Sequence, residues 1–585
     1  MKRSSSRNAN GKGVPFSANP VLALKLAPWR SRLVMFVLFV AFFSLIVRAL
    51  WLQGVSTAFL QKQGESRYAR TLEMPATRGK IVDRNGLVLA SSVPVKAVWA
   101  IPEDVLSEPK EKIQKLAQLL EMSEADVRKK LNSDRQFVYL KRQVEQPVAD
   151  KIVALGISGI ETRKEYKRFY PEGEAMAHVV GFTSVEDTCQ EGMELAEQAS
   201  LAGKLGSRRV IKDRLGHIIE DICAVNEPHD GKDLKLSIDS KIQYLAYAQL
   251  KDTIAKYKAK AGGVVVVDVQ TGEVLALANF PSYNPNDRSA LTGAQLRNRV
   301  MTDTYEPGSV MKPFTVALAL ETNRVTPNTV FQIGSRFAIG TASIGDAHYS
   351  SALTVSQIIE ESSNIGTAKI ALGMPGKEMW EMFTKVGFGQ APKFGFPGAV
   401  AGRVRNYKTW RPIEQATMSY GHGLTTSLIQ LAHAYTIFAR DGELIPLSFV
   451  KTEQLPVAQR VISVKTALTM RAMLESVTGP NGSAILARVP GYRVGGKTGT
   501  AYKVEHGKYV KKYVASFVGF APVSNPRIIV AVMVDEPDPS GLHYGGSVAG
   551  PLFSTIAANV LRTMNVSPDS SVTSVLPDNG LGDSM

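Results

Sequence analysis

The chain has 585 residues, is 44% hydrophobic and carries a formal net charge of +16 at pH 7. These values exclude a fully disordered or fibrous chain and predict several globular domains. Nucleic-acid binding is not expected, because no run of Lys and Arg with interleaved aromatic residues accompanies the basic charge.

The first predicted element is an apolar segment near the N-terminus. No acidic residue precedes Glu65, and the apolar run 33–47 with the five residues after it is long enough to cross a bilayer. A cleaved signal peptide is the rival interpretation, but no small-residue cleavage site follows the run. We therefore predict a basic cytoplasmic segment at 1–32 and a transmembrane anchor at 33–53, with the remainder exported.

The section from about 60 to 235 is mixed. Charged stretches typical of helices lie at 108–120, 124–131 and 146–155, between short β-like runs. No catalytic constellation appears in this section, and we interpret His178 as a hydrogen-bonded structural histidine.

Cys189 and Cys223 are the two cysteines of the chain. Two thiols cannot complete a tetrahedral metal site by themselves, and no histidine cluster surrounds them. In an oxidising compartment they could pair, and the alternative of two free thiols stays equally open.

The section from about 236 to 566 has an α/β pattern. Residues 262–278 predict a β-hairpin with a glycine in its turn, and 514–520 and 527–534 predict two more strands. Helical stretches lie between these strands, so we expect a sheet that encloses a helical insert. The tail at 567–585 is predicted to be disordered.

Three short motifs in this section carry chemistry. Ser309 and Lys312 begin a predicted buried helix, where the spacing i, i+3 lets the amine reach the hydroxyl. A desolvated lysine with a lowered pKa can act as the base that activates a serine.

The other two motifs are Ser362-Ser363-Asn364 and Lys497-Thr498-Gly499-Thr500. Ser-x-x-Lys and Ser-x-Asn recur elsewhere in the chain, whereas Lys-Thr-Gly occurs once. Their order, with the last motif in a strand-like context, is typical of the penicillin-binding protein and serine β-lactamase superfamily.

Further stretches make the resemblance more specific. The chain resembles the FtsI-type class B penicillin-binding proteins, which are septal peptidoglycan D,D-transpeptidases of Gram-negative bacteria. One departure is Cys189, where relatives usually have a glycine. The similar stretches are 77–86, 168–173, 177–181, 210–216, 281–286, 411–417 and 543–546.

The resemblance implies a domain plan. A non-catalytic periplasmic pedestal that touches partners is expected at 54–235, and a transpeptidase domain of the penicillin-binding protein fold at 236–566. It also implies a single-pass protein of the cell inner membrane, with its N-terminus in the cytoplasm. Expected partners are peptidoglycan stem peptides, β-lactams, a SEDS-family glycosyltransferase and other divisome membrane proteins, and no metal or organic cofactor is expected.

The resemblance also implies the reaction. Ser309 would attack the penultimate D-Ala carbonyl of a stem peptide, with Lys312 as its base. Ser362 would pass a proton to the departing D-Ala, while Asn364 would orient Lys312 and bind a substrate amide. Lys497 would polarise Ser362.

The strand motif would bind the substrate. Thr498 and Thr500 would hold the terminal carboxylate, and Gly499 would let the substrate lie close to the strand. The backbone N–H groups of Ser309 and Thr500 would form the oxyanion hole. His422 stands where relatives commonly have an aromatic residue, and we expect it to line the site without a catalytic role.

Two other functions remain as alternatives. A D,D-carboxypeptidase or serine β-lactamase would send the same acyl group to water, but no Glu-x-x-x-Asn lies between 365 and 496 to activate that water. A non-catalytic divisome scaffold or β-lactam sensor is the alternative of another class, and the intact motifs speak against it. The third residue of the stem peptide stays open.

Overall fold

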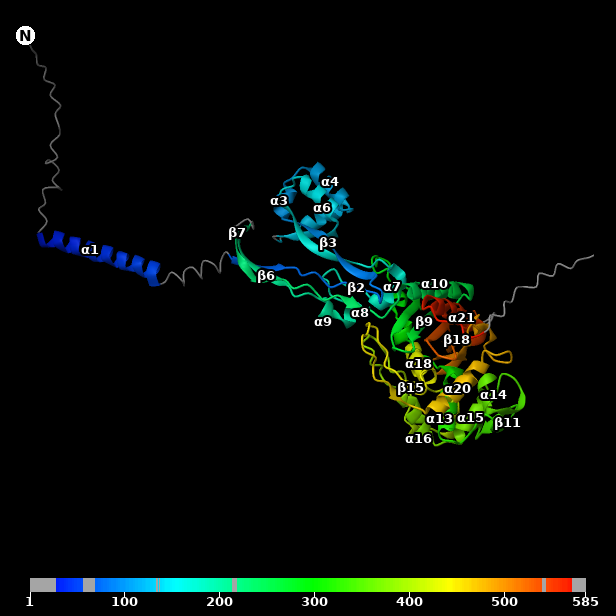
Figure 1. The fold of residues 1–585 in the computed structure, drawn as a ribbon. Coiled ribbons are helices and arrows are strands. Elements are labelled where there is room, and N and C mark those ends of the chain that lie inside the picture. The colour runs from blue at the N-terminus through cyan, green and yellow to red at the C-terminus, as the bar shows by residue number, and fades with distance from the viewer. Residues whose placement is uncertain are drawn as a thin grey trace, which may run out of the picture. The chain divides into compact units, whose positions relative to one another are not determined.

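The computed structural model describes residues 28–55, 69–132, 135, 137–212, 218–538 and 543–570 (Figure 1). The chain forms two compact units. Unit one comprises Met1–Met74 and Leu205–Pro228, and unit two comprises Pro75–Lys204 and His229–Met585.

Unit one contains the predicted anchor. Helix α1, Pro28–Leu50, continues into a short π-helix, Trp51–Val55. Over Pro28–Gly54 it is the one helix among the described residues that is long and apolar enough to cross a membrane. It begins earlier than the predicted residue 33, because Pro28 suits the first turn of a helix. An antiparallel sheet completes the unit, in the order β1 (Ala69–Met74), β6 (Gly206–Lys212), β7 (Ile218–Asn226).

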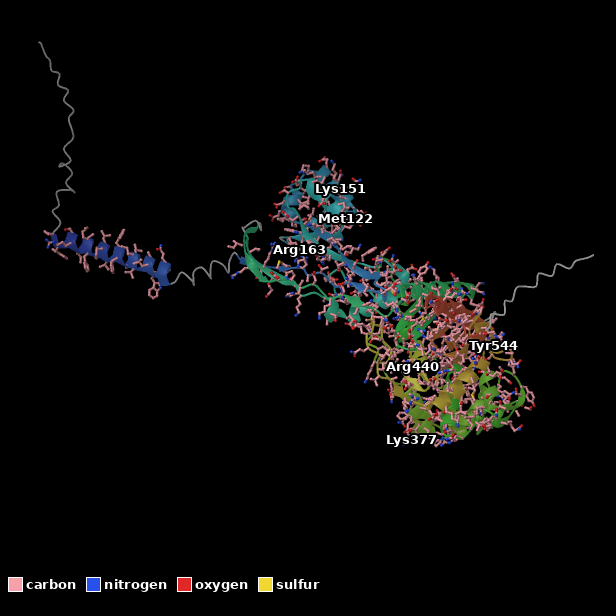
Figure 2. All side chains as sticks on the ribbon, viewed as in Figure 1. Met122, Lys151, Arg163, Lys377, Arg440 and Tyr544 are labelled. Carbon is pink, nitrogen blue, oxygen red and sulfur yellow. The ribbon has the colours of Figure 1, made fainter. Side chains whose placement is uncertain are left out.

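Unit two begins with a five-stranded sheet whose centre is the long strand β3. The predicted charged helices are present at one end of it, with ends shifted by up to two residues. They bury their apolar faces in a core of their own, which includes Val98, Leu116, Val127 and Ile152. Met122 and Lys151 in Figure 2 mark this part of the molecule. The elements are β2 (Ile81–Val82), β3 (Val88–Ala100), α3 (Pro102–Leu106), α4 (Lys110–Leu119), α5 (Glu124–Leu131), β4 (Val138–Val144), α6 (Gln146–Ala154), β5 (Ile160–Phe169) and β8 (Leu234–Lys235).

A buried charge cluster follows this sheet. The carboxylate of Glu194 accepts from Arg78 and from Arg168, both at 2.6 Å, and all three side chains are almost fully buried. Arg78 also donates to the sulfur of Cys189, which is a buried free thiol. Cys189 is therefore not in a disulfide here, and the side chain of Cys223 lies outside the described residues. Glu194 lies on α8 (Gly192–Ala196), and Gln198 of α9 (Gln198–Leu201) accepts from Arg78. Helix α7 (Gly173–Val180) packs against α8.

His178 on α7 has the structural role that the sequence predicts. Its Nε2 lies 2.8 Å from the carbonyl oxygen of Gln295, and the ring packs edge-on against Tyr283. Burial lowers the pKa of His178 to about 4, so the ring is neutral at pH 7.

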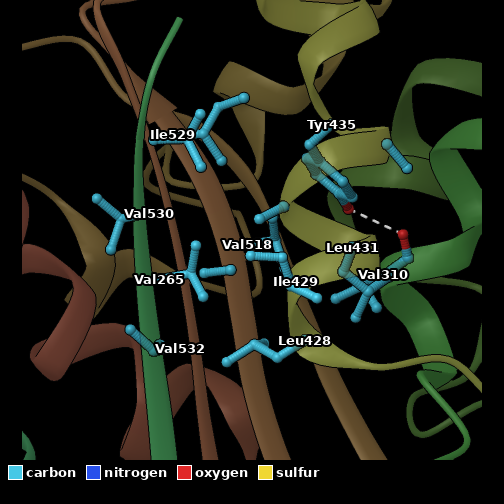
Figure 3. Packing of buried hydrophobic residues seen from close by; sticks show 14 of the residues in the cluster. Val265, Val310, Leu428, Ile429, Leu431, Tyr435, Val518, Ile529, Val530 and Val532 are labelled. Carbon is cyan, nitrogen blue, oxygen red and sulfur yellow. Dashed lines mark hydrogen bonds between the residues drawn. The ribbon is translucent and has the colours of Figure 1, made fainter. Parts of the chain in front are cut away.

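The second five-stranded sheet of unit two is antiparallel throughout and confirms the predicted hairpin and strands. Helices α10 (Ser240–Lys256) and α21 (Gly545–Thr563) pack on one face of it. Helix α18 (Leu428–Ala434) covers the other, where Leu428 and Ile429 meet Val265 and Val518 (Figure 3). The strand order is β10 (Val274–Phe280), β9 (Ala261–Asp268), β19 (Ile528–Asp535), β18 (Lys508–Ala521), β17 (Gly495–Glu505).

The helical insert lies between β10 and β17 in the sequence, as predicted. Its first long helix, α13, is buried, and the ring of Phe314 on it packs against Phe388, Tyr435 and Phe438. The insert comprises α11 (Gly293–Leu296), α12 (Arg299–Thr302), α13 (Lys312–Glu321), β11 (Val330–Gly334), β12 (Phe337–Ile339), β13 (Ala342–Ile344), β14 (Ser350–Thr354), α14 (Val355–Glu360), α15 (Asn364–Leu372), α16 (Gly376–Lys385), α17 (Pro412–Met418), α19 (Thr436–Ala439), β15 (Glu443–Leu444), β16 (Gln459–Arg460) and α20 (Val464–Ser476).

The start of the predicted disordered tail is ordered. Asp569 accepts from the backbone N–H of Arg493 at 2.7 Å and from the hydroxyl of Ser524 at 2.8 Å. Residues 567–570 are thus held against the segments that carry Arg493 and Ser524, and 571–585 lie outside the described residues.

Candidate active site

The first part of the site is the turn that carries Ser309. A 3-10 turn, Gly308–Met311, leads directly into α13, Lys312–Glu321. Gly308 has a φ of +62°, which favours glycine, and its N–H donates to the carbonyl of Gly421 at 3.2 Å. Ser309 is half-buried, whereas the two residues after it are fully buried. The predicted helix is present, but its first turn is a tighter 3-10 turn. The buried residues after Ser309 hold this turn in place.

Lys312 is the fully buried amine next to this turn. Its Nζ donates to the Ser362 hydroxyl at 3.1 Å and also to the Ser362 carbonyl oxygen. Burial and the positive charge of Lys497 hold its pKa well below the usual range of a lysine, while the Asp346 carboxylate acts in the opposite direction. A neutral amine can accept a proton, so the state that a base requires is favoured here.

Ser362 has a backbone conformation that is unusual for serine, with a φ of +66°. The residues after it hold this conformation through Asp346. The Asp346 carboxylate accepts from the hydroxyl of Ser363 and from the N–H groups of Asn364 and Ile365, which open α15. Asp346 therefore fixes the Ser-x-Asn turn, and no motif in the sequence marks it.

Asn364 differs from the expectation drawn from the resemblance. Its side-chain amide donates to the backbone carbonyl of Gly345 at 3.2 Å. Among the described residues no hydrogen bond joins Asn364 to Lys312. The orienting contact is thus not formed in this structure, because the amide is engaged by the segment that also carries Asp346.

Lys497 lies in β17 and is fully buried. Burial lowers its pKa to about 7, and its Nζ donates to the Thr498 hydroxyl at 3.2 Å. Lys497 also depresses the pKa of Lys312. The two lysines therefore lie in one buried region, where the positive charge of Lys497 disfavours the charged form of Lys312.

Gly499 is a glycine for a different reason from the one expected. A β-carbon there would point into the protein, 2.4 Å from the Ser516 hydroxyl and 2.8 Å from the Pro307 carbonyl oxygen. The close approach is thus between β17 and the segment that precedes Ser309. The requirement for glycine thus arises inside the protein, whereas the resemblance implied one on the face that binds the substrate.

Thr500 is tied to the start of α21. Its Oγ1 accepts from the N–H of Gly545 at 2.9 Å. A β-carbon at Gly545 would lie 2.3 Å from the Gly499 carbonyl oxygen, so the helix start lies directly against β17. This contact fixes the strand at the motif.

His422 and Glu306 both contact Tyr509. The ring of His422 packs against Tyr420 and Tyr509, and burial lowers its pKa to about 4. Glu306 accepts from the N–H of Gly423 at 2.9 Å and from the Tyr509 hydroxyl at 3.1 Å. His422 lines the region as a neutral ring, and Glu306 is a half-buried carboxylate that sequence reasoning missed.

Two family models match the chain. The "Penicillin binding protein transpeptidase domain" matches residues 262–558, and the "Penicillin-binding Protein dimerisation domain" matches 73–236. Together they cover both sections of the chain that follow the N-terminal helix.

Relatives and solved structures agree with these matches. The chain is 43% identical to the "Probable peptidoglycan D,D-transpeptidase PenA" of Neisseria gonorrhoeae, over 93% of this chain and 94% of that protein. It is 39% identical to the "Peptidoglycan D,D-transpeptidase FtsI" of Escherichia coli K12, over 93% of each. The apo structure of the TP domain of Burkholderia pseudomallei penicillin-binding protein 3 is 56% identical, with a TM-score of 0.53, and covers 57% of this chain and 98% of that one. The chain therefore belongs to the penicillin-binding protein transpeptidase family.

Proposed function

We propose that this protein is a peptidoglycan D,D-transpeptidase that cross-links stem peptides through a Ser309 acyl-enzyme during septal wall synthesis. The observation that carries the proposal is the buried amine of Lys312, three residues from Ser309 and 3.1 Å from the Ser362 hydroxyl. A serine needs a neighbouring base, and an amine with a depressed pKa supplies one.

In the first step Lys312 takes the Ser309 proton as the oxygen attacks the carbonyl of the penultimate D-Ala. The negative charge that develops on the carbonyl oxygen is stabilised by the N–H groups of Ser309 and Thr500. The peptide bond then breaks, and the proton passes from Lys312 through the Ser362 hydroxyl to the leaving D-Ala amine. The 3.1 Å contact between Lys312 and Ser362 supports this route.

In the second step the amine of another stem peptide attacks the acyl-enzyme. A new amide forms, the ester to Ser309 breaks, and the Ser309 oxygen regains its proton through Lys312. β-Lactams react at the first step and leave an ester in which the opened ring stays attached, so the acceptor amine is blocked.

The terminal carboxylate of the donor is assigned to the hydroxyls of Thr498 and Thr500. Lys497 adds positive potential beneath them and polarises Ser362. Asn364 binds a substrate amide once its own amide turns away from Gly345.

The N-terminal helix supports a place in the cell inner membrane. Helix α1 would cross it once, with the basic N-terminus in the cytoplasm and the rest of the chain in the periplasm. Residues 54–235 would then form the pedestal and 236–566 the transpeptidase domain. A SEDS-family glycosyltransferase and other divisome membrane proteins are the partners that this placement suggests.

A cross-linking assay tests the proposal. The detergent-solubilised protein is incubated with a stem pentapeptide that ends in D-Ala-D-Ala and carries a free side-chain amine. We expect release of D-Ala together with a peptide dimer, both detected by mass spectrometry. Release of D-Ala with tetrapeptide as the sole peptide product would instead identify a carboxypeptidase.

A further inference from the structure

A cavity of about 700 Å³ lies beside the candidate active site, and none of the functional assignments above uses it. Its lining includes Glu306, which precedes the nucleophile by three residues, and the segment Ala501–Val504, which continues β17 past Thr500. This volume is within the range of ordinary ligand sites. A peptide whose C-terminal carboxylate is held at Thr498 and Thr500 and which runs along β17 would therefore reach it.

The lining of the cavity is rich in cationic side chains. Six of its residues are basic and four are acidic. Three ion pairs neutralise three of the acidic groups and three of the basic ones: Arg297 with Asp303, Arg405 with Glu414, and Lys503 with Asp535. The remaining basic residues are Lys260, Arg299 and Arg403, of which Lys260 pairs with Glu536.

Arg299 is the more deeply placed of the other two. It is only 7% exposed, and its Nη1 donates to the backbone carbonyls of Ala294 and Arg297. A nearly buried guanidinium whose bonds go to neutral carbonyls retains its positive charge inside the cavity. The carboxylates of Asp303 and Asp535 also act on Arg299. Each of them is already paired with another cation, Arg297 or Lys503, so Arg299 can still attract an anion in a place where water screens it poorly.

Arg403 is exposed and is held through its backbone, which exchanges two hydrogen bonds with Thr425. Within the described ranges its guanidinium has no hydrogen-bonding or ionic partner. Glu306 is the one acidic residue of the lining outside the three ion pairs, and it already accepts from Gly423 and Tyr509. The cavity thus has two guanidinium groups available for a carboxylate.

Resting on the proposed transpeptidase function, the geometry points to this cavity as the subsite for a carboxylate that the donor stem peptide carries upstream of D-Ala-D-Ala, with Arg299 and Arg403 as its partners. Arginine pairs with carboxylates through two parallel hydrogen bonds, which selects this group over an amide. The subsite is separate from the one assigned to the terminal carboxylate. It would favour donors that carry an additional negative charge.

The test compares matched acyl donors in the absence of any acceptor. Each is a depsipeptide that ends in D-Ala-D-lactate and whose side-chain amine is acetylated, so that no donor can act as an acceptor. Acylation of Ser309 is followed by intact-protein mass spectrometry of the detergent-solubilised full chain. In the first pair, the second residue is γ-linked D-glutamate or its amide, D-isoglutamine. In the second pair, the third residue is diaminopimelate or lysine. The pairs separate the two residues that could supply the carboxylate.

We expect the wild-type protein to be acylated about tenfold faster by the carboxylate member of one pair, which is the scale of a charge-assisted bidentate contact. Arg403→Gln should remove most of this preference, and Arg403→Glu should remove all of it. Arg460→Gln is the matched control, because Arg460 is an exposed arginine outside the cavity whose partner is Glu443. Benzylpenicillin should acylate all four proteins at the same rate, because it lacks the upstream peptide.

Equal rates for both members of both pairs in the wild-type protein would overturn the inference. So would an Arg403→Gln variant that keeps the full preference, or a preference that appears only when an acceptor is added. Failure of benzylpenicillin to acylate the wild-type protein would have a different meaning, since it would overturn the proposed function and this inference with it.

Discussion

A β-carbon on Gly499 would lie 2.8 Å from the carbonyl oxygen of Pro307, so the absence of a side chain at Gly499 sets how closely β17 approaches the nucleophile turn. Backbone on both sides of this contact leaves no flexible group that could move away. The distance between Ser309 and the Lys497–Thr500 motif therefore depends on residue 499 having a hydrogen atom in place of a β-carbon.

Gly499→Ala should slow acylation by benzylpenicillin by about 10²-fold, because a small displacement of reacting groups has this effect. The rate is measured by stopped-flow or by quenched mass spectrometry. The double variant Gly499→Ala, Ser516→Gly removes the contact with the Ser516 hydroxyl and leaves the one with Pro307. Compared with Gly499→Ala, the double variant should be more stable to unfolding, but its acylation rate should remain nearly as low. Full recovery of the rate would show that the Pro307 contact is unimportant.

Asp346→Asn should lower both stability and acylation. The carboxylate accepts three hydrogen bonds at the Ser-x-Asn turn, and an amide can accept fewer of them, so we expect a loss of about 1–3 kcal/mol. Asp569→Asn is a matched control, because Asp569 also accepts from two backbone N–H groups but lies at the C-terminal end. The control should lose stability and keep its acylation rate. Equal acylation by the wild type and Asp346→Asn would contradict the positioning role.

Lys497 predicts a pH dependence of stability. Its pKa is about 7 in the folded protein and 10.5 in a model peptide, so the unfolded chain binds more protons between these values. The contribution of Lys497 to the free energy of unfolding therefore increases with pH between about pH 7 and about pH 10. The increase is at most about 1.4 kcal/mol per pH unit. Denaturant titrations should show the difference between wild type and Lys497→Met increasing over this range. A difference that stays constant would mean that Lys497 keeps its charge.

A stable penicilloyl adduct on Ser309 is expected. Hydrolysis without a positioned base loses about 10²–10⁴ in rate, so the adduct should persist for minutes to hours. Intact-protein mass spectrometry after removal of free drug measures it. Ser309→Ala should give no adduct. Ser107→Ala should give a full one, since Ser107 and Lys110 repeat the spacing outside the site. Rapid turnover without a persistent mass shift would support a β-lactamase.

The N-terminus of the mature protein should be intact. Helix α1 is long and apolar over Pro28–Gly54, and no small-residue cleavage site follows it. N-terminal sequencing of protein purified from membranes checks this. A mature sequence that begins between residues 45 and 65 would mean that the helix is a removed signal peptide.

The motif residues were predictable from the sequence because their chemistry is local. Ser309 and Lys312 are three residues apart on one turn, and Lys497 begins the one Lys-Thr-Gly motif of the chain. The sheet and its helical insert were predictable for a similar reason, since continuous runs of β-branched apolar residues and the turn residues between them mark the strands.

The carboxylates that support the site were not predictable. Asp346 and Glu306 act on N–H groups of Asn364 and Gly423, and only the folded chain brings each pair together. The left-handed backbone of Ser362 has no sequence signal either, because serine seldom adopts it. These features depend on contacts between residues far apart in the chain, and a single sequence does not show which of those residues meet.

The bond from the Gly545 N–H to the Thr500 hydroxyl has a consequence for recognition. A hydroxyl has one hydrogen to give and two lone pairs, and the helix occupies one of those lone pairs. The hydrogen of Thr500 is therefore turned away from Gly545 and stays available to a ligand. The Thr500 hydroxyl is therefore oriented as a hydrogen-bond donor before a peptide binds, which favours a ligand group that accepts hydrogen bonds. A chain end that presents a carboxylate oxygen can accept this hydrogen, whereas an ammonium group can use only the one lone pair that remains.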